Sequence, residues 1–384
     1  MGLITRMHRR IRRERITRSF ARYRSTRPMG YEQFSDDRTP TGAALVRQLP
    51  TCDVINLHWI ADFLDFQAFF SAAPGQVPIV WRLADMNAFT GGCHFDHGCG
   101  RHVSGCGACP QLGSTDTVDL SHQVWQRKKA ALDRLGPKRL HIVVLNHWMA
   151  DLVKRNPLLS RFPLTVIPNG VNTENFAPRG IRVARDRLGL PQEARVVLFV
   201  ADEVTNRRKG FSLLAKALTG LNDVANLFLL STGRGIPTFP SQISHRHLGH
   251  IGTNQLSLAY SAADVYVLPS LQDNQPNTVL EAMACGTPVV GFSVGGIPEM
   301  VRPGITGILA PAEDVDGLCR AILEVLRCPE KHTAMAANCR RIVMDEYRLE
   351  DQIWRYAQVY ETALKELPPR PLSTPKTQSI LEFS

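Results

Sequence analysis

The stretch Leu268-Pro-Ser-Leu-Gln-Asp-Asn-Gln-Pro-Asn-Thr-Val-Leu-Glu-Ala-Met-Ala-Cys-Gly-Thr-Pro-Val-Val-Gly-Phe292 carries the clearest structural signal in this chain. Short apolar runs at 265–268 and 289–292 flank it, as is typical of strands buried on both faces of a parallel sheet. A polar loop and a helical pattern lie between them. We expect Asn277 or Thr278 to cap that helix, so that its amino end faces the loop. The stretch therefore predicts a strand–loop–helix–strand unit with a ligand site in its loop.

Similar apolar runs alternate with helical patterns from residue 53 onward. The other expected strands are residues 54–58, 79–83, 142–146, 164–167, 196–200 and 227–230. The expected helices are residues 211–221, 255–263, 279–285, 315–326, 332–346 and 350–364. This alternation predicts an α/β fold with two doubly wound domains, whose ligands bind at the carboxyl ends of the strands.

Polar and turn residues at 168–178 separate the two series of strands and mark the domain boundary. An apolar strand that runs into a Gly-rich turn does not precede Cys52 in the sequence, so the first domain is expected to be incomplete at its start. The expected parts are a basic arm or helix at 1–45, a first domain at 46–170, a second domain at 171–345, a C-terminal helix at 346–366 and an irregular tail at 367–384.

The positive charge of the chain is concentrated at its amino end. Residues 1–30 hold ten arginines and one glutamate, which is +9 of the net charge of +10. Ile4, Met7 and Ile11 are spaced among these arginines, which indicates a basic amphipathic helix suited to an anionic membrane surface. A solvated, partly disordered arm is an equally good interpretation. Nucleic acid is not expected as a partner, because no reading motif accompanies the charge.

The sequence lacks a run of eighteen or so apolar residues that would predict a membrane-spanning helix. The basic amino end is not followed by the apolar region of a secretory signal. We therefore expect a cytoplasmic protein, which the basic helix could hold peripherally on a membrane face.

Two acidic residues flank the loop of the opening stretch. Asp273 is expected in the loop and Glu281 in the first turn of the helix. One acid near a helix start is ordinary. A second acid eight residues earlier, across a loop rich in amide side chains, favours a polyol site, because carboxylates accept hydrogen bonds from hydroxyls and amides donate to them.

The segment Asn206-Arg-Arg-Lys-Gly210 places cations at the start of the helix expected at 211–221. Cations there oppose the helix dipole. Their presence suggests an anion, such as a diphosphate, that binds both the side chains and the helix amides. A solvated basic turn is the alternative for this segment alone.

Taken together, these motifs resemble glycosyltransferase family 4. The spacing from Asp273 to Glu281, followed by Ala-Met-Ala-Cys-Gly-Thr-Pro, is similar to its donor signature of two acids separated by seven residues. Residues 167–171, 295–299 and 304–307 match as well. The resemblance implies the GT-B fold, two Rossmann-like doubly wound domains that face a cleft. It also implies retaining transfer from a nucleotide diphosphate sugar to a hydroxyl group.

The resemblance further implies roles for individual residues. Glu281 would bind the ribose hydroxyls, Arg208 and Lys209 the diphosphate, and Asp273 the donor sugar; these four form the expected catalytic set. The other expected donor-binding residues are Arg207, Asn274, Gln275, Asn277, Thr278 and Val279. Asp273 stands where the family usually has Glu. Ala201-Asp202 replaces the usual Gly-Arg, so Arg207 or Arg208 must supply the second positive charge.

The segment 91–110 is rich in cysteine, histidine and glycine. Its thiols are spaced as Cys93-x5-Cys99-x6-Cys106-x2-Cys109, which fits a structural zinc site of four thiolates. His94, His97 or His102 could replace one thiolate. Reduced thiols in a loop, or a redox pair, are the alternatives. A cofactor for catalysis is not expected.

Residues 53–59 and 85–94 resemble the colanic-acid-type bacterial branch of the same family. Enzymes of this branch extend lipid-linked polysaccharides at the inner membrane face, so Asp85 and His94 are expected on the acceptor side. Ala84 stands where relatives often carry His.

Three rival functions differ from this interpretation. The chain could be another GT-B enzyme, such as a nucleotide-sugar epimerase or a glycogen-synthase-like transferase. It could instead be a truncated or degenerate transferase without activity that binds a membrane or a partner. A dehydrogenase is disfavoured, because G-x-G-x-x-G does not follow any expected strand.

Overall fold

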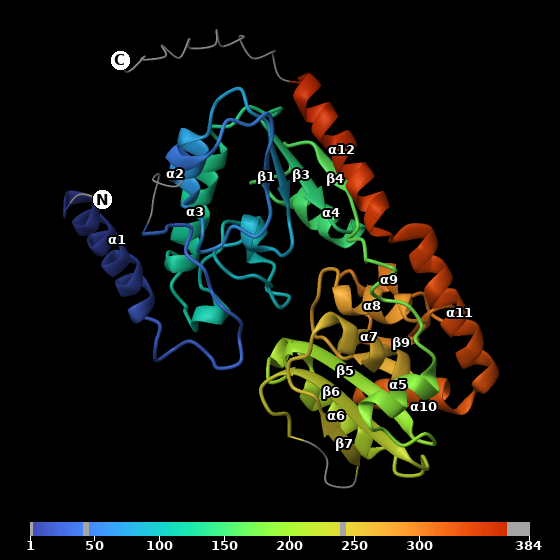
Figure 1. The fold of residues 1–384 in the computed structure, drawn as a ribbon. Coiled ribbons are helices and arrows are strands. Elements are labelled where there is room, and N and C mark those ends of the chain that lie inside the picture. Colours follow the sequence, from blue (N-terminus) through green and yellow to red (C-terminus); the bar gives the residue numbers. More distant parts are fainter. Residues whose placement is uncertain (1–2, 41–45, 239–242, 367–384) are drawn as a thin grey trace, which may run out of the picture.

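The computed structural model describes residues 3–40, 46–238 and 243–366, which form two α/β domains (Figure 1). The first domain contains a four-stranded parallel sheet in the order β1-β2-β3-β4. Its strands are β1 (Ile55–Leu57), β2 (Ile79–Arg82), β3 (Leu140–Val144) and β4 (Leu164–Val166). Its helices are α2 (Phe66–Ala72), α3 (Leu120–Leu132) and α4 (His147–Arg155). The prediction that this domain is incomplete stays a prediction.

The second domain contains a six-stranded parallel sheet in the order β10-β9-β8-β5-β6-β7. Its strands are β5 (Arg195–Glu203), β6 (Leu227–Arg234), β7 (Ser244–His247), β8 (Val265–Leu268), β9 (Val289–Phe292) and β10 (Gly307–Ala310). The strand order reverses between β5 and β8. In open α/β sheets, ligands bind beyond the carboxyl ends of the strands at such a reversal.

Helices cover both faces of the second sheet. They are α5 (Ile181–Leu188), α6 (Phe211–Thr219), α7 (Thr253–Ala262), α8 (Asn277–Ala284), α9 (Ile297–Met300), α10 (Val315–Arg327) and α11 (Pro329–Glu346). One apolar cluster joins the sheet to α5, α7, α8 and α11, and another joins it to α6 and α10. This double cover explains why the strands have continuous apolar sequences.

The last described helix, α12 (Leu349–Glu366), returns to the first domain. Figure 1 shows it running from the second domain along the first. Tyr356, Val359 and Ala363 pack with Val80 and Val143 of the first sheet in one apolar cluster. The C-terminal helix therefore contributes to the core of the domain that is most distant from it in sequence.

The eight expected strands are present, and two further strands were missed. β7 has the polar sequence Ser-His-Arg-His and lies at an edge of the sheet, so apolar periodicity could not reveal it. The start of α8 also needs correction. The helix begins at Asn277 after Pro276, no side chain caps it among the described residues, and Glu281 lies beyond its first turn.

The arginine-rich amino end forms a helix, α1 (Leu3–Ala21), as one of the two interpretations predicted. Arg12 forms an ion pair with Asp65, which also caps α2. After α1, Tyr23 and Phe34 pack against Cys93 in a small apolar cluster. Within the described ranges, no helix is long and apolar enough to cross a membrane.

Candidate functional site

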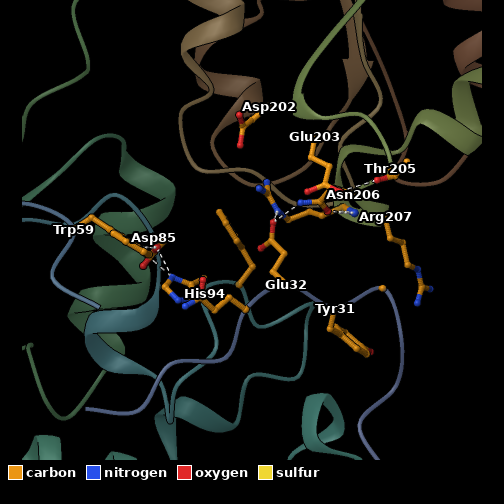
Figure 2. Close-up of a pocket in the computed structure, with 14 residues that line it drawn as sticks. Tyr31, Glu32, Trp59, Asp85, His94, Asp202, Glu203, Thr205, Asn206 and Arg207 are labelled. Atoms are coloured by element: carbon orange, nitrogen blue, oxygen red, sulfur yellow. Dashed lines mark hydrogen bonds and ion pairs between the residues drawn. The ribbon is translucent and has the colours of Figure 1, made fainter. Parts of the chain in front are cut away.

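A cavity of about 610 Å³ lies between the two domains, beyond the end of β5. Three parts of the chain line it, and Figure 2 shows their side chains converging. The lining residues are Asp202, Glu203 and 205–208 from the second domain, Trp59, Asp85 and 94–95 from the first, and 30–33 from the segment before β1. The position agrees with the reversal of strand order between β5 and β8.

Arg208, Lys209 and Asp273 come together, as the sequence predicted. Lys209 Nζ lies 2.7 Å and Arg208 Nη1 3.1 Å from Asp273 Oδ2. The two segments follow neighbouring strands, β5 and β8. Gly210 lets them approach, because it has φ +72° and a Cβ there would lie 1.8 Å from the carbonyl oxygen of Pro269.

Arg208 is buried and held from several sides. Its Nη1 donates to the carbonyl oxygen of Gln272 at 2.8 Å, and its guanidinium lies 4.2 Å from the ring centroid of Phe95. Its Nε donates to Glu32 Oε1 at 2.6 Å. Burial alone would lower the pKa of Arg208, but Asp273 and Glu32 outweigh it and raise the pKa above its ordinary value. Arg208 is therefore a fixed positive charge at the wall of the cavity.

Asp273 is only 6% exposed. Burial alone would raise its pKa, but Lys209 and Arg208 outweigh that effect and hold the pKa of Asp273 below its ordinary value. The carboxylate thus stays ionised and bound to the two cations. Lys209 and Asp273 lie behind Arg208 and are not among the described residues that line the cavity.

The amide side chains of the loop after Asp273 bind the first domain in this structure. Asn146 Nδ2 donates to the carbonyl oxygen and to Oδ1 of Asn274, at 2.9 and 2.8 Å. Asn169 donates to Gln275 Oε1 through its backbone at 2.6 Å and to Asn277 Oδ1 through its side chain at 2.9 Å. These amides, predicted as donor ligands, connect the domains here.

Val279 and Thr278, two of the residues predicted to bind the donor, make contacts within the second domain, and their donor-binding role stays a prediction. The side chain of Val279 is fully buried in the core of the second domain, and its N–H donates to the carbonyl oxygen of Pro276 at 3.0 Å. Thr278 Oγ1 accepts a hydrogen bond from Tyr266 at 2.8 Å. Both residues are therefore used inside their own domain.

Glu281 accepts a hydrogen bond from the hydroxyl of Tyr260 on α7, at 2.9 Å. Burial raises the pKa of Glu281 above its ordinary value, and the hydrogen bond from Tyr260 opposes that rise. Among the described residues, those that line the 610 Å³ cavity do not include Glu281. Its predicted contact with a ribose is thus not prearranged at this cavity.

Asp85 and His94, both predicted on the acceptor side, form a pair in the first domain, and their acceptor role stays a prediction. His94 Nδ1 lies 2.7 Å from Asp85 Oδ2, and Trp59 Nε1 donates to the same oxygen at 3.0 Å. The other ring nitrogen of His94 lies 2.9 Å from Ser35 Oγ. The half-exposed Trp59 ring lies beside this pair (Figure 2).

A glycine turn packs against the Asp273 loop beside the site, and Glu299, farther along, joins the two domains. Gly295 has φ +57°, and a Cβ there would lie 1.9 Å from the carbonyl oxygen of Asp273. Farther along the same segment, Glu299 accepts hydrogen bonds from the backbone N–H groups of His147 and Trp148 at 2.9 and 2.7 Å. A carboxylate of the second domain thus caps helix α4 of the first.

The cysteine-rich segment is a tightly turned loop, with positive φ at His97, Cys106 and Ala108. Within the described residues, no three His, Cys, Asp or Glu side chains are grouped so that they could hold a metal ion. Burial raises the pKa of Cys106 to about 12 and that of Cys93 well above its ordinary value. Burial thus favours the thiol over the thiolate form of these two residues, and the zinc site stays a prediction.

Several residues at the cavity were not found from the sequence. Trp59 follows β1 closely, so its place near the carboxyl end of a strand was a usable signal. Glu32 has no such signal, because it lies in a segment without periodic pattern. Phe95, Asp202 and Glu203 also line the cavity, and Asp202 pairs with Arg234 at 2.5 Å. Arg234 thus brings a guanidinium close to Asp202 at the end of β5.

Residues 194–328 match the family described as "Glycosyl transferases group 1". A D-inositol 3-phosphate glycosyltransferase of Geodermatophilus obscurus is 33% identical over 198 residues, 46% of this chain and 42% of the relative. An N-acetyl-alpha-D-glucosaminyl L-malate synthase of Bacillus anthracis is 24% identical over 223 residues, 56% of this chain and 57% of the relative. The chain spans about half the length of the curated relatives that it matches.

Solved structures show the same fold. A sucrose-phosphate synthase from Thermosynechococcus elongatus has a TM-score of 0.63 and 23% identity, covering 82% of this chain and 74% of that one. HepE from Anabaena, in complex with UDP and glucose, has a TM-score of 0.61 and 17% identity, covering 84% and 81%. The fold is GT-B, and the comparisons together support the group 1 glycosyltransferase family.

Proposed function

We propose that this chain is a glycosyltransferase that moves a sugar from a nucleotide diphosphate sugar to a hydroxyl group of a glycan. The grouping of Arg208, Lys209 and Asp273 at the carboxyl edge of β5 and β8 carries the proposal. The three residues lie within 194–328, the part that matches the group 1 family. Two cations beside the amino end of α6 suit a diphosphate.

The proposed transfer retains the configuration of the sugar. The bond between the anomeric carbon and the diphosphate oxygen breaks, and the acceptor oxygen forms the new bond on the same face. The acceptor proton passes to the departing diphosphate. Arg208 and Lys209 stabilise the charge that develops on this leaving group, which is the main electrostatic demand of the step.

We propose a neutral glycan as the acceptor. The half-exposed Trp59 offers a ring face to a sugar, and Asp85 can accept hydrogen bonds from hydroxyls. Two curated relatives are named for inositol 3-phosphate and for L-malate, both anions. Here the carboxylate of Asp85 lies directly beside Trp59, which disfavours an anionic acceptor at that ring.

We extend the proposal to a growing lipid-linked polysaccharide of the colanic-acid type. Helix α1 supports this extension, because it exposes arginines such as Arg10 and Arg18, whose side chains are 83% and 82% accessible. An anionic membrane surface attracts such a helix. The site of action would then be the inner face of the membrane.

Turnover by Glu281→Ala tests the proposed donor site. A panel of nucleotide sugars is incubated with an acceptor glycan, and free nucleotide and extended glycan are measured. We expect Glu281→Ala to lower turnover by at least about 100-fold, the usual loss when a key polar contact of an active site is removed. Glu330→Ala, an exposed change on α11, serves as the control. Near-normal turnover by folded Glu281→Ala would reject this site.

A further inference from the structure

Glu32 brings a carboxylate into the proposed diphosphate site from outside both sheets. It lies in the segment between α1 and β1, and Figure 2 shows its side chain pointing at the second domain. Its Oε1 accepts hydrogen bonds from Arg208 Nε at 2.6 Å and from Asn206 Nδ2 at 3.1 Å. A carboxylate of the protein itself therefore occupies a position on Arg208 at which an anionic ligand would bind.

This carboxylate completes a neutral group. Arg208 and Lys209 carry two positive charges, and Asp273 and Glu32 carry two negative ones. Arg207 also lines the cavity, but these four groups together offer a diphosphate no surplus positive charge, and both carboxylates repel it. Binding of the donor with Glu32 in place is therefore electrostatically unfavourable.

Of the two carboxylates, Glu32 is the displaceable one. Asp273 is held within its own domain by Lys209 and Arg208, and its side chain is 9% accessible. Glu32 has a side chain that is 17% accessible and comes from a different part of the chain. Its withdrawal leaves Arg208 bound to Asp273 and gives the site one positive charge.

The same segment separates two cavities. Gly30 and Tyr31 line both the 610 Å³ cavity and a second one of about 440 Å³, which reaches Gln272 and Gly295. Arg207 also lines both. Movement of the segment that carries Glu32 would therefore open one cavity toward the other, next to the loop that holds Asp273.

We propose that Glu32 competes with the diphosphate of the donor for Arg208 and so sets the affinity of the enzyme for its donor. The proposal rests on the proposed function, because the competitor is the nucleotide diphosphate. Binding of the donor replaces the carboxylate on Arg208 and frees residues 30–33 from the cleft. The apparent affinity is then the intrinsic affinity multiplied by the fraction of molecules in which Glu32 has left the site.

Isothermal titration with UDP and with GDP tests this proposal on the full chain. Glu32→Gln removes the charge, and Glu32→Ala removes the group. Glu203→Gln is the matched control, because it removes from the same cavity a carboxylate that accepts a hydrogen bond from Thr205 Oγ1 at 2.9 Å rather than from Arg208. We expect both Glu32 variants to lower the Kd for the nucleotide on the order of tenfold, because the ligand no longer has to displace the charge-assisted hydrogen bond between Glu32 and Arg208. Glu203→Gln should lower the Kd less.

Two other results are informative. If the wild-type chain binds a nucleotide and the folded Glu32 variants bind it no more tightly than Glu203→Gln, the competition is refuted and the proposed function stands. If neither nucleotide binds to the wild-type chain or to any variant, both proposals fail. A nucleotide that binds only to the Glu32 variants would support the competition strongly.

Discussion

Arg208 and Asp273 illustrate what single residues reveal before a structure is known. Each follows an apolar strand, and the carboxyl ends of neighbouring parallel strands meet at one edge, so their proximity was predictable. The bond between Glu32 and Arg208 was not, because Glu32 precedes the first sheet and reaches the site only through long-range packing. The burial of the Val279 side chain was not predictable either, because a sequence motif does not distinguish residues that face a ligand from those that face the core.

The ionisation of Glu281 leads to a pH prediction. Burial raises its pKa above the ordinary 4.5, and the hydrogen bond from Tyr260 lowers it. As the pH falls, Glu281 takes up a proton sooner than an exposed glutamate and can no longer accept two hydroxyl hydrogen bonds. Tyr260→Phe removes the hydrogen bond that lowers the pKa of Glu281. As the pH falls, the loss of nucleotide affinity should therefore begin at a higher pH than in the wild type. Kd values between about pH 4.5 and 8 check this.

If the pH at which nucleotide affinity is lost is lower in Tyr260→Phe, or unchanged, the assignment of Glu281 to nucleotide binding is contradicted.

The raised pKa of Glu281 also has a consequence for the stability of the fold. The folded state holds this proton more tightly than the unfolded state, so the contribution of Glu281 to stability is full below pH 4.5 and is lost as the pH rises through the folded pKa.

Among the elements, α8 and the cysteine-rich loop show which local details a sequence pattern does not predict. The position of α8 was predictable from its apolar flanks, but its cap was not, since Pro276 precedes it. Spacing of thiols predicts proximity, and Cys106 and Cys109 do affect the pKa of Cys93. Spacing does not predict whether thiols are arranged around an ion, which depends on the turns at His97 and Ala108.

Metal analysis of the purified protein tests the zinc prediction for this loop. If zinc binds, it must displace thiol protons whose pKa burial has raised, so affinity should increase with pH. We expect about one zinc ion per chain in protein purified without chelators, and loss of most of it in Cys106→Ser. Metal-free protein in which Cys93, Cys99, Cys106 and Cys109 all react as free thiols would show that the loop is held by packing alone.

At the scale of the whole molecule, hydrogen bonds between the domains hold the cleft in this arrangement. Asn146, Asn169 and Glu299 supply many of them. The two-domain architecture was predictable from the two series of strands separated at 168–178. The contacts between domains were not, because each joins side chains more than a hundred residues apart whose positions depend on both domains having folded.

Glu299→Ala should loosen this arrangement. The carboxylate caps α4 across the cleft through two backbone N–H groups, a contact worth about 1 kcal/mol when a helix cap is removed. Small-angle scattering of Glu299→Ala should show a larger radius of gyration than the wild type. Glu346→Ala is the matched control, because Glu346 pairs with Arg302 within the second domain. An equal effect of the two changes would show that Glu299 does not hold the domains together.

Nucleotide binding at Arg208 is the central claim of this account, and titration of UDP and GDP into the wild-type chain and Arg208→Gln tests it most directly. Thermal unfolding of each protein confirms that it is folded. We predict saturable binding of one nucleotide to the wild type and a Kd at least about tenfold higher in Arg208→Gln, as expected when a charged hydrogen-bond partner is lost. Equal affinity in the two folded proteins, or no binding of either nucleotide to the wild type and to Glu32→Gln, would contradict the claim.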